Sequence, residues 1–122
     1  MKSHSMLESS DLIPNLERIK KWHYDRNLIE GATDKDQVCK LIQEVGELSD
    51  NVCKTRDIRD DIGDIIVVLV NIAERNGITI SECVDQAYND IKDRKGKMID
   101  GIFVKEEDKP SYSNTAIGQT KY

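Results

Sequence analysis

Residues 60–74 read DDIGDIIVVLVNIAE, with three carboxylates directly before one of the most apolar runs in the chain. On a helical wheel, residues 65–70 are apolar nearly all the way round, and such a helix is normally buried from several sides. An unpaired carboxylate next to a buried helix is costly, because its charge loses water without gaining a partner. The stretch therefore predicts a central helix whose acids have a compensating partner.

The composition favours one small helical domain. The chain has 122 residues, of which 34% are charged and 5% aromatic, and its net charge is -5. Few aromatics favour helix over sheet, and the excess of acid argues against a nucleic-acid partner. No segment approaches the roughly 20 apolar residues of a membrane span. Cys39, Cys53 and Cys83 lack CxxC spacing and are expected to be reduced, partly buried thiols, so we expect a cytoplasmic protein that binds no membrane.

Four helices and a short arm are predicted. The helices are expected at residues 12–29, 34–54, 57–76 and 79–95, with Gly31, Gly77 and Gly96 as C-terminal stops. Residues 79–82 form a capping-box pattern, and the Asp-Gly pair at 100–101 favours a tight hairpin turn. Short connections favour antiparallel neighbours. The predicted fold is all-α, an antiparallel four-helix bundle with a short C-terminal arm, spanning residues 1–107 and followed by a flexible polar tail at 108–122.

A second copy of the chain is expected to complete this core. The helix at 57–76 is apolar on nearly every side, and four helices of one short chain would struggle to surround it. A partner subunit is therefore expected to supply part of its cover.

Two acidic pairs lie on neighbouring helices. In the helix at 34–54, the polar stripe is separate from the apolar stripe and, taken alone, would be interpreted as a solvated face; it comprises Gln37, Lys40, Glu44, Glu47 and Asn51. The two pairs, Glu44/Glu47 and Asp61/Asp64, have i, i+3 spacing, which places each pair on one helix face. If the helices pack side by side, four carboxylates converge and repel. A hard divalent cation removes that conflict, so the sequence predicts a site for Mg²⁺, with Mn²⁺ as a substitute.

The string Gln37-x-x-Lys40-Leu41-x-x-Glu44-x-x-Glu47-Leu48, followed by Asp61-Ile62-Gly63-Asp64, resembles the MazG-like nucleoside triphosphate pyrophosphohydrolases, whose signature is ExxE, a spacer and ExxD. The resemblance extends into residues 93–101 and covers roughly residues 15–107. Position 61 departs from the pattern, because Asp stands where the family more often has Glu. Its shorter reach leaves open whether Asp61 binds a metal directly or through water.

The resemblance implies an activity and an assembly. Family members hydrolyse (deoxy)nucleoside triphosphates between the α and β phosphates, and they work as dimers or tetramers with Mg²⁺ held by the four acids. It therefore implies that Glu44, Glu47, Asp61 and Asp64 are metal ligands, that Glu44 or Glu47 acts as the catalytic base, and that the chain forms a homodimer or homotetramer.

Seven further residues are predicted to contact the nucleoside triphosphate. Lys40 is expected either to pair with Glu44 or to reach a phosphate, and Trp22 to serve the core or an interface or to stack on the base. Asn71, polar on a buried helix, needs a hydrogen-bond partner from a sugar or base or from another subunit. The remaining candidates are Gln37, Lys92, Arg94 and Lys95, the last three in a basic cluster near the end of the fourth helix, where pairing with the helix C-terminus is the structural alternative.

Two rival interpretations remain open from sequence. The first keeps the site but changes the substrate, as in dUTP/dCTP-type or phosphoribosyl-ATP-type pyrophosphohydrolases. The second is a non-catalytic helical interaction module, in which the acids form salt bridges with Lys40, Arg75 and their neighbours.

Overall fold

The computed structural model describes residues 4–106, with side chains from residue 11 onward, and the predicted tail at 108–122 lies outside this range. The chain divides into two compact units, Met1–Cys83 and Val84–Tyr122. Four helices and a two-stranded arm confirm the all-α fold class. None of the described helices is both long and apolar enough to cross a membrane.

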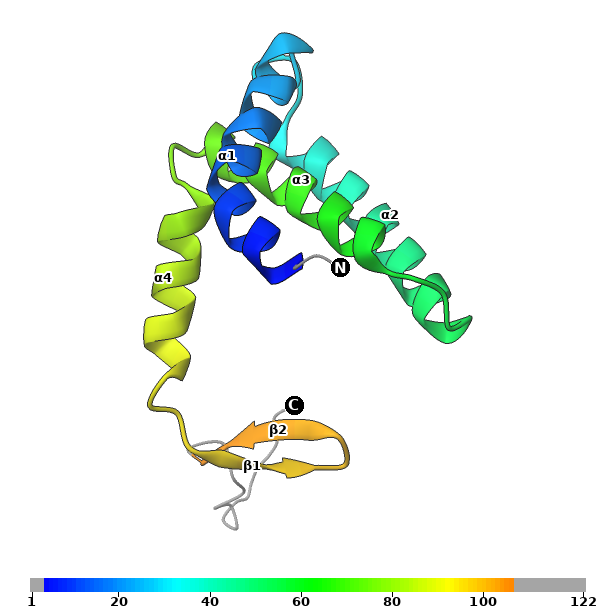
Figure 1. The fold of residues 1–122 in the computed structure, drawn as a ribbon, viewed down its shortest axis with the longest axis vertical. Coiled ribbons are helices and arrows are strands. Elements are labelled where there is room, and N and C mark those ends of the chain that lie inside the picture. The colour runs from blue at the N-terminus through cyan, green and yellow to red at the C-terminus, as the bar shows by residue number, and fades with distance from the viewer. Residues whose placement is uncertain (1–3, 107–122) are drawn as a thin grey trace. The chain divides into compact units, whose positions relative to one another are not determined.

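The first unit is built around α3 (Arg59–Arg75). The helix α2 (Asp34–Cys53) lies alongside α3, and α1 (His4–Asp25) packs against it as well (Figure 1). The buried apolar side chains are Val68, Val70 and Ala73 of α3 with Ile29 from the α1–α2 connection. The predicted burial of α3 is thus confirmed for its core face, whereas Ile62 and Leu69 of the same helix are exposed.

Two helices begin with the side-chain caps that their sequences favour. At the start of α2, Thr33 accepts a hydrogen bond from the Asp36 amide, and Asp36 accepts one from the Thr33 amide, both at 3.1 Å. At the start of α4 (Ile80–Ile91), the Glu82 carboxylate accepts from the Thr79 amide at 2.8 Å, and Thr79 accepts from the Glu82 amide at 3.0 Å. These reciprocal bonds satisfy amides that have no partner within the helix, and they confirm the capping box predicted at residues 79–82.

The helices α1, α2 and α3 end in the same motif, with a left-handed residue two positions after the last helical one. The residues are Asn27 (φ 58°), Thr55 (φ 58°) and Gly77 (φ 71°). In α1 the following amide, of Leu28, donates back to the His23 carbonyl at 2.9 Å. The predicted end of this helix at residue 29 is therefore wrong, because Asn tolerates the left-handed conformation and stops the helix four residues earlier.

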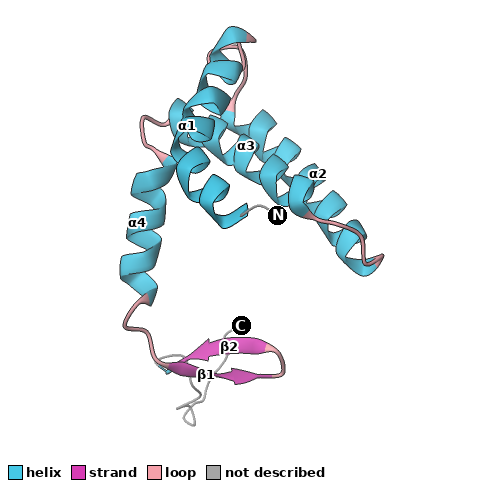
Figure 2. Cartoon of the chain, viewed as in Figure 1, coloured by secondary structure: helices cyan, strands magenta, loops and turns pink. Residues whose placement is uncertain are grey.

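The second unit contains most of α4 and a hairpin of β1 (Gly96–Ile99) and β2 (Ile102–Lys105) (Figure 2). Asp100 and Gly101 both have positive φ, as the tight turn predicted from the Asp-Gly pair requires. The predicted end of α4 at Lys95 is wrong, since the helix ends at Ile91. Gly96 opens β1 instead of stopping α4, and a Cβ there would lie 2.1 Å from the Val104 carbonyl oxygen.

Four side chains of the apolar stripe of α2 are exposed in the described chain. Ile42 keeps 65% of its surface accessible, and Val38, Val45 and Val52 are also exposed. The opposite side of α2, which carries Glu44 and Asn51, is the side that meets α3. The three cysteines are free and exposed, so their predicted partial burial is wrong, because Cys39 and Cys53 of α2 lie away from the contact with α3.

Candidate functional site

One acid of each pair lies where α2 and α3 pack together. Glu44 of α2 and Asp61 of α3 are each only 6% exposed. Asp64, one turn along α3, is half-buried, and Glu47 is exposed. The polar stripe of α2 is therefore not solvated throughout, because Glu44 is enclosed against α3, whereas Lys40 and Glu47 are exposed.

Asp61 is held by an amide from the facing helix. The Asn51 side chain donates from Nδ2 to both Asp61 carboxylate oxygens, at 3.1 and 3.0 Å. Arg56 in turn donates to Asn51 Oδ1 at 3.3 Å. The sequence had placed Asn51 on the same stripe as the acids without giving it a role, and its position one turn beyond Glu47 is the signal that identifies it. Asn51 fixes the orientation of Asp61 through neutral hydrogen bonds and leaves its charge uncompensated.

Only one of the two Glu44 carboxylate oxygens has a partner among the described residues. Its Oε2 forms an ion pair with Lys40 Nζ at 3.1 Å. Its Oε1 is buried and has no hydrogen-bond partner in the described part of the chain. A buried carboxylate oxygen without a partner is costly, and at a cluster of acids it indicates a place for a cation.

The acids influence one another electrostatically. Burial, followed by the negative charges of Asp60, Glu44 and Asp61, raises the pKa of Asp64 above its ordinary value. The hydrogen bond to Glu44 raises the pKa of the Lys40 ammonium, and the charge on Glu44 adds to this effect. Weaker contributions to Lys40 come from Glu47 and Asp64. Each of the four predicted metal ligands therefore contributes its charge to the pKa of Asp64 or of Lys40, or has its own pKa shifted by the others.

The donor set fits a hard divalent cation. All four acids have carboxylate oxygens, the ligand atoms that Mg²⁺ prefers, and Glu44 Oε1 has no hydrogen-bond partner among the described residues. Within residues 11–106, no three acidic, histidine or cysteine side chains come close enough to hold a metal ion. Ligation by all four acids would therefore require side chains to turn. Glu44 and Asp61 are buried, whereas Glu47 is exposed and Asp64 is half-buried.

An open groove of about 530 Å³ runs between α1 and α3 and reaches Asp64. Trp22 is 43% exposed, and the Arg26 guanidinium lies 4.5 Å from the centre of its ring. Arg18 donates to Asn15 at 2.7 Å. Asn15 and Arg18 were not among the predicted site residues. Asn15 lies three residues before Arg18 and seven before Trp22, a spacing that places all three on one face of α1. The groove is lined by Asn15, Arg18, Ile19, Trp22, Asp64 and Val67.

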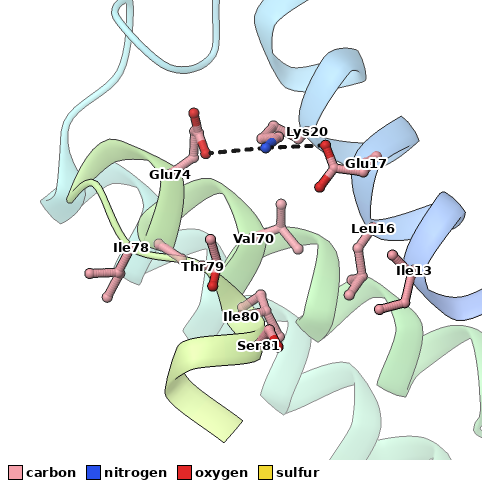
Figure 3. Close-up of a pocket in the computed structure, with 11 residues that line it drawn as sticks. Ile13, Leu16, Glu17, Lys20, Val70, Glu74, Ile78, Thr79, Ile80 and Ser81 are labelled. Carbon is pink, nitrogen blue, oxygen red and sulfur yellow. Dashed lines mark ion pairs between the residues drawn. The ribbon is translucent and has the colours of Figure 1, made fainter. Parts of the chain in front are cut away.

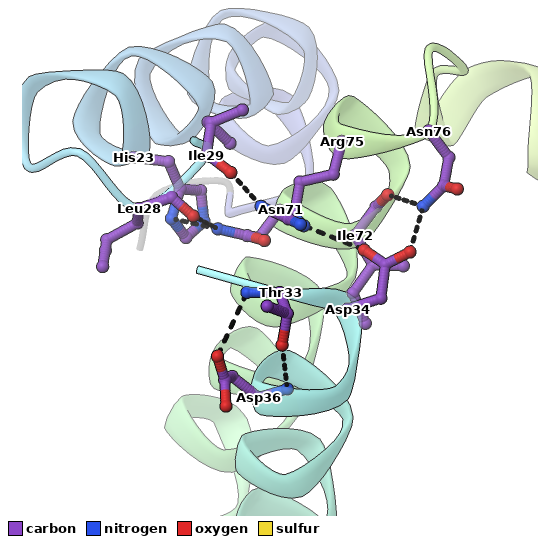
Figure 4. Close-up of polar contacts among 10 residues, drawn as sticks. All are labelled: His23, Leu28, Ile29, Thr33, Asp34, Asp36, Asn71, Ile72, Arg75 and Asn76. Carbon is purple, nitrogen blue, oxygen red and sulfur yellow. Dashed lines mark hydrogen bonds and ion pairs between the residues drawn. The ribbon is translucent and has the colours of Figure 1, made fainter. Parts of the chain in front are cut away.

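Asn71 is fully buried, and its partners belong to its own chain (Figure 4). Its Nδ2 donates to the Leu28 carbonyl at 3.0 Å and lies 3.2 Å from Nδ1 of the buried His23. His23 Nε2 lies 2.8 Å from the Val67 carbonyl, so Nε2 carries the proton and Nδ1 accepts from Asn71. The required partners are thus His23 of α1 and Leu28 of the α1–α2 connection, a source that the sequence alone had not indicated.

The remaining predicted contacts are spread over both units. Gln37 is half-buried on α2. Lys92, Arg94 and Lys95 are exposed in the second unit, where Arg94 and Lys95 line a shallow groove with Asp90, Asp93 and Glu106. Their contact with a triphosphate stays a prediction.

A separate apolar pocket of about 160 Å³ lies between α1, the end of α3 and the start of α4 (Figure 3). Lys20 crosses its rim, with Nζ 3.2 Å from Glu17 and 4.0 Å from Glu74. None of the predicted site residues lines this pocket, and it is distinct from the groove that reaches Asp64.

The sequence of the chain is similar to a known family and to a phage protein. A family model described as the MazG nucleotide pyrophosphohydrolase domain matches residues 33–99, which include all four acids. Over 71 residues the chain is 42% identical to an "uncharacterized 18.2 kDa protein in rep-hol intergenic region" of Haemophilus phage HP1 (strain HP1c1). That match covers 57% of this chain and 44% of the relative, so it spans less than half of the relative's length. No solved structure matches the chain.

Proposed function

Because the chain belongs to the MazG nucleotide pyrophosphohydrolase family, we propose that it hydrolyses (deoxy)nucleoside triphosphates between the α and β phosphates. The products would be a nucleoside monophosphate and pyrophosphate. The proposed cofactor is Mg²⁺, for which Mn²⁺ would substitute.

The observation that carries the proposal is the state of Glu44. This acid is buried beside two others, Asp61 and Asp64, and has one oxygen without a partner. The ion pair with Lys40 leaves this buried oxygen unsatisfied, which costs stability. A site that receives a cation accounts for the unused oxygen.

The acids take different roles in this proposal. Glu44, Glu47, Asp61 and Asp64 would hold the cation, which supplies neutralising charge to the triphosphate and orients the attacking water. Of the two candidates for the base, Glu47 is favoured over Glu44, since it is exposed and has no ion-pair partner among the described residues. Asn51 keeps Asp61 turned toward α2.

The groove between α1 and α3 is the proposed place for the nucleoside. Trp22 offers an exposed ring for stacking on the base, and Ile19 and Val67 add apolar lining. Arg18 supplies a guanidinium, which suits phosphate oxygens. Asp64 lines the groove and also belongs to the acidic cluster, so a nucleoside there would extend its phosphates toward the acids.

A homodimer or homotetramer is proposed as the working assembly. Four apolar side chains on one face of α2 are exposed, and a contiguous apolar face of this kind is typical of an interface. A second copy would cover them without disturbing the contact between α2 and α3.

Product analysis tests the proposal. The full chain is incubated with Mg²⁺ and each of a panel of ribo- and deoxyribonucleoside triphosphates, and the products are separated by anion-exchange chromatography. We expect monophosphate and pyrophosphate in equal amounts from at least one substrate. Release of orthophosphate with nucleoside diphosphate would overturn the proposed site of cleavage, and no turnover of any nucleotide would favour the interaction module.

A further inference from the structure

Lys40 and Glu44 form an ion pair that joins the surface of α2 to its buried side. They lie one turn apart, with Nζ 3.1 Å from Oε2. The Lys40 side chain is 53% exposed and the Glu44 side chain only 8%. The lysine is thus free to swing on its four-carbon stem, whereas the carboxylate is held in place by the packing of α2 on α3.

Other pairs of the same spacing provide a contrast. Lys54 pairs with Asp50 on the same helix at 2.9 Å, and both side chains are exposed by about half. Exposed pairs of this kind contribute little to stability, because water screens them and side-chain entropy opposes them. Removing the partner of a buried acid is far more costly, since the charge remains without compensation. Lys40 therefore compensates the charge of a buried carboxylate, Glu44, whereas Lys54 pairs with an exposed carboxylate that water already solvates.

The neutralisation by Lys40 is incomplete. One ammonium faces Glu44, while Asp61 and Asp64 contribute two more negative charges nearby. None of the ion pairs among the described residues includes Asp64, and Glu44 Oε1 has no hydrogen-bond partner there. A single positive charge reached from the surface is a weaker counter-ion for such a cluster than a divalent cation placed among the acids.

We propose that Lys40 is a built-in counter-ion, which holds Glu44 in the cation-free protein and turns to the triphosphate when a divalent cation takes its place. This inference rests on the proposed function, because it assumes that Glu44 is a metal ligand. The ammonium and the cation repel each other and compete for the same carboxylate. Once displaced, Lys40 lies at the exposed rim of the site, one helical turn from Glu44, where an incoming polyphosphate would bring negative charge.

Competition of this kind couples the two ligands. A cation that binds alone loses part of its binding free energy, because it must displace Lys40 from Glu44. That loss is offset when a triphosphate accepts the released ammonium. Each ligand then strengthens the binding of the other by the same factor, as linkage requires.

Mn²⁺ binding to the full chain without nucleotide provides the first test. The free Mn²⁺ signal is followed by electron paramagnetic resonance for the wild type, Lys40→Met and the matched control Lys54→Met. We expect Lys40→Met to bind Mn²⁺ about tenfold more tightly than the wild type, the order expected for removal of one close competing charge. Lys54→Met should bind like the wild type.

Chemical labelling separates displacement from a general effect of charge. Lysines of the wild type are acetylated briefly with and without Mn²⁺, and each site is quantified by mass spectrometry. We expect acetylation of Lys40 to rise several-fold with Mn²⁺ and that of Lys54 to stay constant. Equal Mn²⁺ affinity of wild type and Lys40→Met, or unchanged labelling of Lys40, would overturn the counter-ion role and leave the metal site standing. Failure of all three proteins to bind Mn²⁺ would overturn the metal site itself and this inference with it.

Discussion

Glu44 lies against α3 with a single ion pair, although its carboxylate has two oxygens and little access to water. The spacing of the acids in the sequence was sufficient to predict that Glu44 shares a helix face with Lys40 and Glu47. Its burial was not predictable from that spacing, because the polar stripe of an isolated helix looks the same whether it faces water or another helix. The contact with α3 decides between the two.

The stability of an Asn71 variant shows whether the buried Asn71 amide stabilises the fold. We expect Asn71→Leu to lower the free energy of unfolding by about 2 kcal/mol or more, because the Leu28 carbonyl and His23 Nδ1 would each lose a buried hydrogen bond. Urea denaturation measures the change, with Gln43→Leu as the control for an exposed amide on α2. Equal stability of Asn71→Leu and the wild type would contradict the structural role and favour the predicted contact of Asn71 with the substrate.

At the scale of the elements, caps and left-handed residues set where each helix begins and ends. The capping boxes of α2 and α4 follow local rules, and the sequence predicted the start of both helices. The end of α1 was less predictable, because Asn27 and Gly31 both permit a left-handed stop and the sequence favoured the glycine. Contacts of the α1–α2 connection with α3 accompany the earlier stop.

The end of α2 carries strain that a glycine would relieve. Thr55 is β-branched and sits at φ 58°, a conformation that costs residues with a Cβ about 1–2 kcal/mol. We expect Thr55→Gly to raise the free energy of unfolding by about 1 kcal/mol in urea denaturation, since part of the gain is offset by the greater freedom of glycine in the unfolded chain. Asn27→Gly, at the same φ, should change stability less. A loss of stability in Thr55→Gly would contradict the assigned backbone conformation.

The start of α2 is tied to the end of α3 by a pH-dependent contact. The Arg75 guanidinium donates to Asp34 at 2.8 Å, and Asn76 donates at 3.1 Å (Figure 4). These bonds, with Arg75 the larger cause, lower the pKa of Asp34 below its ordinary value of 3.8. A carboxyl with a lowered pKa stabilises the folded chain above its unfolded value and loses that contribution as pH falls through the folded value.

Asp34→Asn should therefore be less stable than the wild type at pH 7, and the difference should shrink as pH falls below about 4. Urea denaturation at pH 7 and at pH 3 measures both differences. A difference of the same size at the two pH values would show that the charge on Asp34 does not contribute.

At the scale of the whole molecule, the sequence predicted the four helices and the hairpin arm. The convergence of the four acids on one cation stays a prediction. The sequence did not predict which side of α2 meets α3. Both stripes of this helix satisfy a helical wheel, and the apolar stripe is the usual choice for the core. The structure instead leaves Val38 and Ile42 exposed on a single chain. The proposed second copy would bury these apolar side chains at the interface.

Ile42 tests that assembly. Its side chain is among the most exposed of the apolar stripe, so Ile42→Asp should leave the fold of a single chain intact. We expect the wild type to have the mass of a dimer or tetramer in light scattering after gel filtration, and Ile42→Asp to shift toward the monomer. Gln43→Asp, which adds the same charge beside the stripe, should retain the wild-type mass. A monomeric wild type would contradict the proposed interface.

The acids on α2 and α3 are proposed to carry Mg²⁺-dependent release of pyrophosphate. The most direct test is the rate of pyrophosphate release by Glu47→Gln, because Glu47 is exposed and its replacement should not disturb packing. We expect a loss of at least about 100-fold, as for removal of a catalytic acid or base, with an unchanged circular dichroism spectrum. Asp50→Asn, one turn further along α2, should remain close to the wild type. Near-full activity of Glu47→Gln would contradict this proposal.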